Sequence, residues 1–319
     1  MVNFFSLVNE DIRLVEERML TQSKGYHPDL DSALAHLLIS GGKRIRPAVA
    51  LLTGRMFGVE HDRLITLAAA IELLHTATLV HDDLIDGSLL RRGNPTLNSH
   101  WSPGATILTG DFIFARAANL AAETGSVEVM QLFARTLAII VNGEITQMFS
   151  ERNPIDRPAY YQRIYSKTAS LFETTTRAAA LLGPVEGAIC DAVSRFGHEI
   201  GMAFQIVDDV LDFTGEQTTV GKPVGSDLRQ GLITLPVIYY LEAHPSESDL
   251  AIVFQANNLN EERIVNLINS IRNSEAIQQS LDEANQYVER GLHAISNLPL
   301  TPERKALEEL ARFIVQRLK

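Results

Sequence analysis

The segment LVHDDLIDGSLLRRGNPT, residues 79–96, places three aspartates at the end of an apolar helix and two arginines shortly after it. Asp82 and Asp86 are four residues apart, so on a helix their carboxylates are neighbours on one face, whereas Asp83 lies about 100° round the helix. Three like charges repel one another unless a cation neutralises them. A solvated acidic face is the alternative, but the preceding residues, LLHTATLV, are mostly apolar. The segment therefore favours a site for a hard cation such as Mg²⁺.

A second segment repeats this arrangement later in the chain. FQIVDDVLDFTG, residues 204–215, carries Asp208, Asp209 and Asp212 with the same spacing, again after an apolar helix. One DDxxD motif is a weak signal, but two at the ends of apolar helices are a strong one. If the two helices pack side by side, six carboxylates face one another across a cleft, which is tenable only when cations fill it. We predict that all six aspartates bind metal.

Helical periodicity dominates the rest of the chain, with apolar residues three and four apart in about a dozen segments. Strand-like alternation bounded by hairpin turns is absent. The composition, with 45% hydrophobic and 21% charged residues, supports a large core, and no composition shift marks a domain boundary. We predict an all-α protein with a single domain over residues 1–319. Residues 213–234 break the pattern with four glycines and are predicted to be an irregular lid or binding loop, with a mere connector as the alternative.

The totals exclude several classes of protein. A net charge of -11 is unsuitable for a general nucleic-acid binder. Cys190 is the single cysteine, which excludes a disulfide framework and a multi-cysteine zinc site. The first residues do not resemble a signal peptide, and the longest apolar stretch, residues 64–80, is interrupted by Glu72 and His75. We expect no membrane-spanning segment and a cytoplasmic location.

Two groups of basic residues accompany the first aspartates, one before a helix start near Pro47 and one directly after the aspartates. They are Lys43, Arg44 and Arg46 in the glycine-bounded segment GGKRIRP, and the pair Arg91 and Arg92. Each group alone is typical of a solvated surface. Arginine forks match phosphate oxygens and lysine supplies a point charge. Combined with the aspartates, these residues indicate two anionic groups, one bridged to carboxylates by metal and one held directly by lysine and arginine.

Polar residues also interrupt the apolar helices. His75 lies near the helical face of Asp82 and is either a satisfied core histidine or part of the site. The same choice applies to Lys167, Thr168 and Gln205. Each is either part of the site or a hydrogen-bonding group inside a helix with no chemical role. Lys167 is harder to explain by structure alone, since a buried lysine needs an anionic partner.

Taken together, these segments resemble the trans-isoprenyl diphosphate synthases, also called polyprenyl synthetases. The resembling segments are GGKRIRP, LVHDDLIDGSLLRRGNPT, GDFIFARA, GEITQ, YSKTASLF, FQIVDDVLDFTG and GKPVGSDLRQGLITLP, in family order. The resemblance implies a single-domain isoprenoid synthase fold with helices around a deep central cavity, assembled as a homodimer. It implies a Mg²⁺-dependent prenyltransferase, with about three ions per active site, that ionises an allylic diphosphate and joins it to isopentenyl diphosphate.

The resemblance also assigns residues to these ligands. It implies that the six aspartates form two metal-binding motifs. The residues implied to take part in catalysis are Asp82, Asp83, Asp86, Lys167 and Asp208. The isopentenyl diphosphate site is implied to contain Lys43, Arg46, His75 and Arg92. The contacts of the allylic diphosphate are implied to be Arg91, Lys167, Thr168, Gln205 and Lys222.

One position departs from the family pattern. Many members have a lysine after the glycine that here is Gly231, whereas this chain has Leu232. One cation near the allylic diphosphate is therefore missing, and Arg229 or Lys222 is a candidate to replace it.

The helix before the first aspartates is implied to line the pocket that receives the growing product. In the family, bulky aromatics four and five residues before the first aspartate give short products, whereas here these positions hold Thr78 and Ala77. Leu74 lies one turn deeper, and Phe133 on a neighbouring helix is a candidate floor. We therefore predict a product of about C30 to about C50 by family analogy.

Three other functions stay open. A class I terpene cyclase needs no second diphosphate site, so GGKRIRP and the second DDxxD motif oppose it. A short-chain farnesyl or geranylgeranyl diphosphate synthase is opposed by Ala77 and Thr78. A silent subunit of a heteromeric prenyl synthase would be expected to lose aspartates, which are intact here, and Leu232 is the one feature in its favour.

Overall fold

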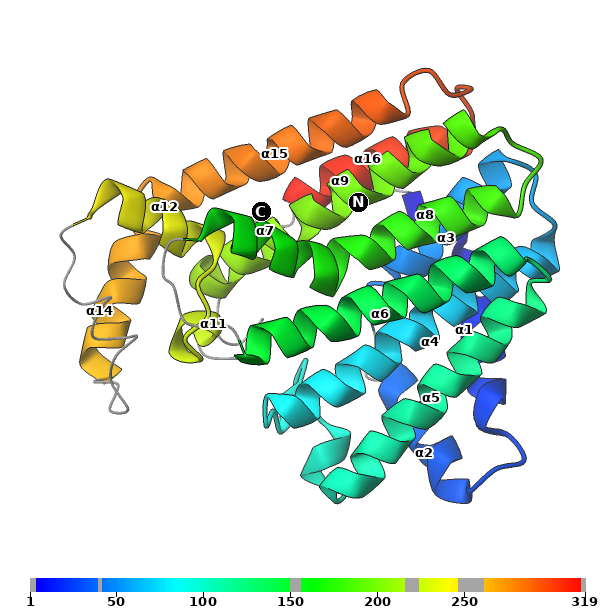
Figure 1. Ribbon diagram of the computed structural model, residues 1–319, viewed down its shortest axis with the longest axis horizontal. Coiled ribbons are helices and arrows are strands. Elements are labelled where there is room, and N and C mark those ends of the chain that lie inside the picture. The colour runs from blue at the N-terminus through cyan, green and yellow to red at the C-terminus, as the bar shows by residue number, and fades with distance from the viewer. Residues whose placement is uncertain (1–3, 40–41, 150–155, 216–223, 246–260, 317–319) are drawn as a thin grey trace. The chain divides into compact units, whose positions relative to one another are not determined.

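The computed structural model describes residues 4–39, 42–149, 156–215, 224–245 and 261–316. Within these ranges the chain is helical almost throughout (Figure 1), which confirms the all-α prediction. The α-helices are α1 (Asn9–Leu20), α2 (Pro28–Ile39), α3 (Ile45–Met56), α4 (His61–Ile85), α5 (Pro103–Glu123), α6 (Val127–Phe149), α7 (Arg157–Ile164), α8 (Ser170–Leu181), α9 (Gly187–Thr214), α11 (Ser226–Arg229), α12 (Leu235–Ala243), α14 (Glu261–Arg272), α15 (Ala276–Ala294) and α16 (Pro302–Gln316). Short 3₁₀ turns are η1 (Phe4–Leu7), η2 (Thr21–Ser23) and η3 (Leu97–Ser99), and η4 (Tyr165–Ala169) is π-helical.

A short β-hairpin follows α4, which the sequence did not predict. β1 (Leu90–Arg91) pairs antiparallel with β2 (Asn94–Pro95), leaving Arg92 and Gly93 as a two-residue turn. Both turn residues have positive φ, +52° and +78°, as in the type I′ turn whose twist matches paired strands. Asn-Gly and Asp-Gly are the usual sequences of such a turn. The sequence Arg92-Gly93 therefore did not indicate a hairpin.

The chain divides into two compact units. Unit 1 comprises Met1–Leu137, Leu171–Gly197 and Ala294–Leu310, and unit 2 comprises Ala138–Ser170, His198–His293 and Ala311–Lys319. Helices α6, α8, α9, α15 and α16 contribute residues to both units. The first aspartate motif belongs to unit 1 and the second to unit 2. The single domain over residues 1–319 stays a prediction.

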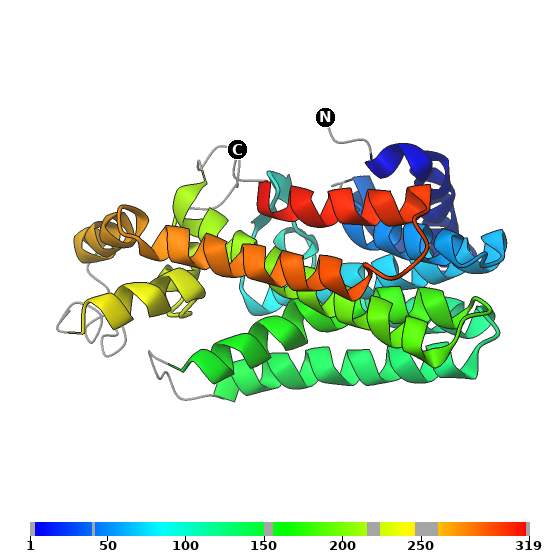
Figure 2. The same ribbon diagram turned by 90° about the horizontal axis from the view of Figure 1, so that it is seen from above.

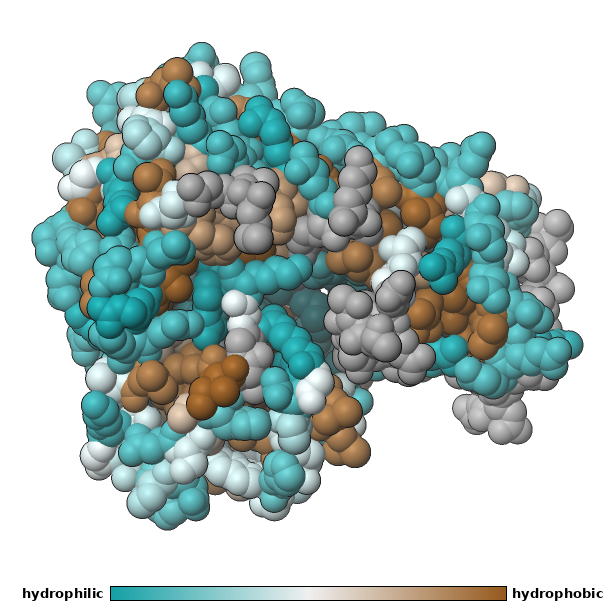
Figure 3. Space-filling model, turned by 180° about the vertical axis from the view of Figure 1, so that it is seen from behind, coloured by the Kyte–Doolittle hydropathy of each residue, from teal (hydrophilic) through white to brown (hydrophobic). Residues whose placement is uncertain are grey.

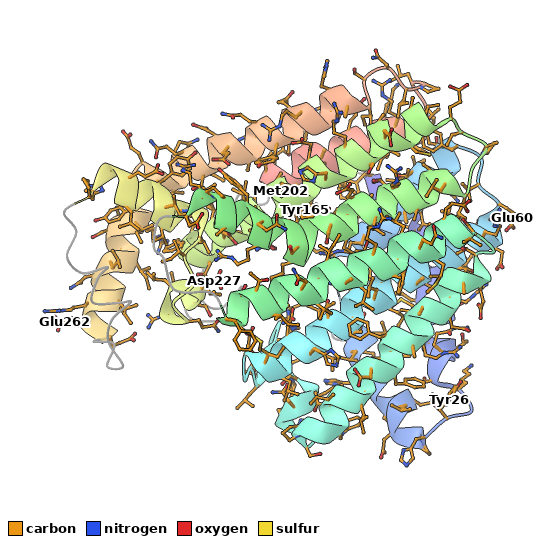
Figure 4. The ribbon with its side chains drawn as sticks, in the orientation of Figure 1. Tyr26, Glu60, Tyr165, Met202, Asp227 and Glu262 are labelled. Atoms are coloured by element: carbon orange, nitrogen blue, oxygen red, sulfur yellow. The ribbon has the colours of Figure 1, made fainter. Side chains whose placement is uncertain are left out.

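The central helix of unit 1 is α4, which packs against α1, α3 and α5 (Figures 1 and 2). It is apolar nearly all round, and Leu64 and Ile71 are at most 1% exposed. Glu60, labelled in Figure 4, caps its N-terminus, because the carboxylate accepts hydrogen bonds from the N–H groups of Asp62 and Arg63 at 2.9 and 2.8 Å. The packing of α4 fixes the place where the first aspartates emerge.

By length and composition, α4 is the one helix in the described ranges that could cross a membrane. Of its most apolar stretch, 78% is buried inside the protein, as in the core helix of a globular protein. On the face of the molecule shown in Figure 3, hydrophilic side chains cover most of the surface and apolar patches lie between them.

In unit 2 the end of α9 packs with α11, α12 and α14 around an apolar cluster. Its buried members are Phe213, Leu228, Val237, Tyr240, Leu241, Ile264, Leu267, Ile268, Ile271 and Ala276. α12 also packs against α7 (Figure 1). Gly225 has a φ of +69°, and a Cβ added there would lie 2.3 Å from Ile268 Cδ1. Glycine is therefore needed where α11 approaches α14.

The prediction that residues 213–234 are irregular is wrong in part. Phe213 and Thr214 continue α9, and α11 forms within the segment. The reason is burial, since Phe213 and Leu228 are both 0% exposed in the apolar cluster. Residues 216–223, including Lys222, lie outside the described residues.

Candidate active site

Two arginines of the predicted site have left-handed backbone conformations. Among the described residues, Arg44 (φ +46°) and Arg92 (φ +52°) are the non-glycine residues with positive φ. This conformation costs an L-residue about 1–2 kcal/mol. It persists where surrounding contacts impose it, and it clusters at functional sites. Arg44 directly precedes α3, and Arg92 lies in the hairpin turn after α4.

The side chain of Arg44 points into unit 1 and anchors the basic loop. Its guanidinium donates to Glu16 Oε1 at 2.8 Å, to Glu72 Oε1 at 3.0 Å and to the carbonyl of Leu38 at 3.1 Å. The side chains of Arg44 and Glu72 are 11% and 6% exposed. Burial opposes the charge, but the two carboxylates raise the pKa of Arg44 above its ordinary value. Arg44 is therefore a structural anchor, whereas the neighbouring Lys43 is exposed.

His75 lies among the arginines of the basic loop and the hairpin. Burial first, and then the charges of Arg46, Arg92 and Arg91, lower the pKa of His75 well below its ordinary value. A Cβ added at Gly42 would lie 3.1 Å from Arg92 Nη1, so the hairpin arginine reaches the basic loop. The structure thus brings together most of the predicted isopentenyl diphosphate site, and the histidine within it is neutral at physiological pH.

The three carboxylates of the first aspartate motif differ in their exposure to solvent. Asp82 is half-buried at the end of α4, and Asp86, the C-cap, is exposed. Asp83 is 6% exposed. Arg91 Nε donates to both oxygens of Asp83 at 2.9 Å, and Arg91 Nη2 lies 2.8 Å from Oδ1. Asp82 and Asp86 are therefore the accessible carboxylates, and Asp83 orients an arginine predicted to contact the allylic diphosphate.

The second motif follows the same pattern. Asp208 is half-buried, whereas the middle aspartate, Asp209, is 3% exposed. Tyr160 Oη donates to Asp209 Oδ2 at 2.8 Å, and Gln205 Nε2 donates to Oδ1 at 2.9 Å. Thr168 Oγ1 in turn donates to Gln205 Oε1 at 2.7 Å. Two residues predicted to contact the allylic diphosphate, Thr168 and Gln205, are thus connected to the aspartate motif.

The carboxyl group of Asp209 has a strongly shifted acidity. Burial, followed by the charge of Asp227, raises the pKa of Asp209 to about 7, and the hydrogen bonds from Gln205 and Tyr160 oppose this change. The effect of Asp227 shows that a further carboxylate stands near the motif.

Asp212 ties α11 to the end of α9. Its Oδ1 and Oδ2 accept hydrogen bonds from the N–H groups of Ser226 and Asp227, both at 3.1 Å, and its carbonyl accepts from Gly225 N at 2.8 Å. The last aspartate of the second motif therefore positions Asp227, which Figure 4 labels on α11. We did not predict a role for Asp227, although it lies in the segment GKPVGSDLRQGLITLP that carries part of the family resemblance.

Lys167 and Thr168 lie in η4, a π-helical turn of a kind frequent at functional sites. The expectation that Lys167 is buried is wrong, because its side chain is 38% exposed. Its Nζ lies 2.9 Å from Glu144 Oε1 on α6. At Gly143, an added Cβ would lie 2.5 Å from Ser166 Cβ, so the two elements are in close contact. Glu144 is a partner that the sequence did not indicate.

The described candidate for the missing cation near Leu232 is Arg229. Leu232 donates its N–H to the carbonyl of Asp227 at 2.8 Å, which keeps the loop beside α11. Arg229 Nη1 lies 2.6 Å from Glu261 Oε1, and its Nε donates to the carbonyl of Val224 at 3.1 Å. Compensation for the missing lysine by Arg229 would require this ion pair to open.

The four residues predicted to control product length lie in unit 1. Leu74 and Ala77 on α4 are 0% exposed, and Phe133 on α6 is 2% exposed. Thr78 is half-buried, and its hydroxyl donates to the carbonyl of His75 at 2.7 Å. Their roles in product length stay predictions.

The donor set of both motifs suits a hard cation. Neither motif carries sulfur or nitrogen ligands, and oxygen ligands alone are what Mg²⁺ prefers. Over the ranges that the structure describes, no three His, Cys, Asp or Glu side chains gather closely enough to form a complete protein site. Mg²⁺ usually retains waters and shares its coordination with phosphate oxygens, so two accessible carboxylates in the first motif and one in the second are compatible with it.

Known proteins resemble this chain over nearly its whole length. A family model described as polyprenyl synthetase matches residues 27–271. Heptaprenyl diphosphate synthase component 2 of Geobacillus stearothermophilus is 38% identical over 315 residues, which cover 98% of each chain. Octaprenyl diphosphate synthase of Haemophilus influenzae is 34% identical over 98% of this chain and 95% of the relative. The crystal structure of polyprenyl synthase from Caulobacter crescentus, complexed with calcium and isoprenyl diphosphate, matches with a TM-score of 0.93 at 35% identity, covering 100% of this chain and 98% of that chain.

An all-α fold shared over the full length and two aspartate motifs with adjoining arginines define a prenyltransferase. The chain belongs to the polyprenyl synthetase family, and the resemblance drawn from its motifs is confirmed.

Proposed function

We propose that the chain is a trans-polyprenyl diphosphate synthase, which joins isopentenyl diphosphate to an allylic diphosphate. The observation that carries this proposal is the cluster of Arg46 and Arg92 around the neutral His75 in unit 1. This cluster is distinct from the carboxylates of Asp82 and Asp86. A cluster of cationic side chains together with a metal-binding motif suits two diphosphates, one held by protein cations and one through metal.

We propose Mg²⁺ as the cation, with Asp82, Asp86 and Asp208 as accessible carboxylates. The number of ions, about three, is part of this proposal. When bound, Mg²⁺ stabilises the negative charge that develops on the departing diphosphate.

The cationic side chains bind and orient the two substrates in this proposal. Lys43, Arg46 and Arg92 hold isopentenyl diphosphate through charge-assisted hydrogen bonds. A neutral His75 adds a hydrogen bond without a further charge. Nε and Nη2 of Arg91 contact Asp83, and the remaining N–H groups of its guanidinium donate to the allylic diphosphate in this proposal.

The proposed reaction breaks one C–O bond and forms one C–C bond. Ionisation of the allylic diphosphate leaves an allylic carbocation, and the double bond of isopentenyl diphosphate attacks it. A proton then leaves the condensed carbon chain to restore an allylic double bond, and the released diphosphate accepts it. Water would quench the carbocation, so the site must exclude water during this sequence.

We propose a medium-to-long product, about C30 to about C50. The small side chains of Ala77 and Thr78 support this length, because in the family bulky aromatics at these positions give short products. The heptaprenyl and octaprenyl synthases named above are consistent with it.

We also propose that the chain acts as a homodimer. In unit 2, α6 exposes an apolar stripe in which Val141, Ile145 and Met148 are 44%, 49% and 57% exposed. Spacings of four and three residues are those of a helix that packs against another helix. The Geobacillus relative is component 2 of its enzyme by name, so a second kind of subunit is the alternative. Light scattering of the purified chain separates these, since a monomeric wild type would contradict the homodimer.

The function is tested by incubating the purified chain alone with radiolabelled isopentenyl diphosphate, Mg²⁺ and several allylic primers. Product chromatography then gives the chain length. We expect incorporation into one or more primers and a product of medium to long chain. Failure with every primer would refute the proposal, and products that stop at farnesyl or geranylgeranyl length would identify a short-chain synthase. Incorporation that needs another protein would identify a heteromeric enzyme.

A further inference from the structure

Tyr160, on α7, is a buried residue that neither the sequence motifs nor the family resemblance assigned to the site. It is 1% exposed, and its hydroxyl donates to Asp209 Oδ2 at 2.8 Å. Gln205 Nε2 donates to the other oxygen of the same carboxylate. Each oxygen of Asp209 therefore has one protein donor, and these two donors come from different helices, α7 and α9.

The direction of the hydrogen bonds in this network follows from the chemistry of its members. When Asp209 is ionised, as it is when it binds a cation, its carboxylate can only accept, so the amide nitrogen of Gln205 faces Asp209 and the amide oxygen faces Thr168. Thr168 Oγ1 lies 2.7 Å from that oxygen and donates to it. Thr168 in η4 thus donates to Gln205, and Gln205 donates to Asp209. Tyr160 donates to the other oxygen of the Asp209 carboxylate.

The surroundings of Tyr160 prevent its ring from moving. The guanidinium carbon of Arg163 lies 5.4 Å from the ring centroid, and the ring of Tyr161 lies edge-on at a centroid distance of 5.4 Å. Arg163 is itself held through a hydrogen bond to the carbonyl of Ile233. A hydroxyl on such a fixed ring can set the orientation of a carboxylate.

We infer that Tyr160 is a positioning residue of the second aspartate motif, which fixes the Asp209 carboxylate and thereby sets the affinity of that motif for a divalent cation bound with diphosphate. This inference rests on the proposed function. Outer partners that orient metal-site carboxylates typically change metal affinity by about 10- to 100-fold when removed. The isopentenyl diphosphate cluster in unit 1 shares none of these contacts, so binding of that substrate should not change.

The test compares Tyr160→Phe with Tyr161→Phe, the same change one residue along. Tyr161 Oη donates to Glu283 Oε1 at 2.5 Å and makes no hydrogen bond to Asp209. Binding of Mn²⁺ in the presence of inorganic pyrophosphate is measured by electron paramagnetic resonance, which requires no turnover. We expect about tenfold weaker Mn²⁺ binding for Tyr160→Phe and less than about a twofold change for Tyr161→Phe, with KM for isopentenyl diphosphate unchanged in both.

Wild-type Mn²⁺ affinity in Tyr160→Phe, or equal losses in both variants, would overturn the inference. If Tyr160→Phe does not fold, Gln205→Met removes the donor to the other oxygen at similar volume and should weaken Mn²⁺ binding by a similar factor. An unchanged affinity in that variant would overturn the inference as well. A wild-type chain that binds Mn²⁺ but condenses no substrate would refute the proposed function alone, because the Mn²⁺ comparison does not depend on condensation.

Discussion

Replacing Arg44 with methionine should destabilise the protein strongly, although Arg44 lies in a basic segment that the sequence alone would allow to be solvated. The change removes the cation that neutralises Glu72, whose side chain is 6% exposed. It also releases Glu16 and the carbonyl of Leu38 from their hydrogen bonds. Methionine keeps much of the apolar length of arginine, so the loss is mainly electrostatic.

The size of the effect follows from burial. Leaving one member of a buried ion pair without its partner costs about 3–5 kcal/mol. Loss of the ion pair with Glu16 lowers the free energy of unfolding by less, on the order of 0–1 kcal/mol, because the side chain of Glu16 is 40% exposed. An unfolding entropy of about 2.1 cal/mol/K per residue gives roughly 0.7 kcal/mol/K for the 319-residue chain. A loss of about 4 kcal/mol therefore lowers the melting temperature by about 6 °C.

Differential scanning calorimetry measures this shift, and Arg13→Met is the matched control. Arg13 also pairs with two glutamates, but its side chain is 57% exposed, so Arg13→Met should leave the melting temperature almost unchanged. The double variant Arg44→Met/Glu72→Leu should recover most of the lost stability, because no buried charge is left unpaired. The reasoning fails if Arg44→Met is as mild as Arg13→Met, or if the double variant is no more stable than Arg44→Met.

Three further predictions concern the proposed site. Ala77→Phe should shorten the product by filling the space beside α4, and an unchanged product distribution in chromatography would contradict the pocket. His75 has a pKa well below its ordinary value of 6.5 in the folded chain, so the unfolded chain binds one more proton in acid. The free energy of unfolding should therefore fall below about pH 6.5, by up to about 1.4 kcal/mol per pH unit; urea titrations of His75→Gln should lack this contribution, and an identical pH profile would argue against it. Chelation by EDTA should abolish condensation and added Mg²⁺ should restore it, whereas activity that survives chelation would exclude metal dependence.

Local patterns predicted the helices well, because helical periodicity depends on short spacings. An i, i+4 pair lies on one face of any helix, so the placement of Asp82 and Asp86 on one side of the end of α4 follows from their spacing. The 25-residue α4 was visible as a run that is apolar on all sides. In an irregular loop, residue spacing does not determine the direction in which a side chain points. Nothing in GGKRIRP indicated that Arg44 turns inward.

Long-range partners account for most of what the sequence did not reveal. Tyr160 is 49 residues from Asp209, and Arg44 is 28 residues from both Glu16 and Glu72. Such pairs are created by packing rather than by spacing. The hairpin was missed for a related reason, because its turn places arginine in a conformation that usually selects asparagine or glycine. That strain is maintained by contacts that only the folded chain provides.

The two aspartate motifs share the same letters, but their middle positions have different electrical requirements. Asp83 faces a guanidinium, which needs a compensating charge, whereas Asp209 faces a phenol and an amide, which need only hydrogen-bonding partners. Asparagine at position 83 should therefore disturb the fold around Arg91, whereas asparagine at position 209 should leave the fold intact and weaken the affinity of the motif for a divalent cation. Counting aspartates in a related chain would miss this difference, since a DNxxD sequence would lose an ion pair in the first motif and a charge that attracts the cation in the second.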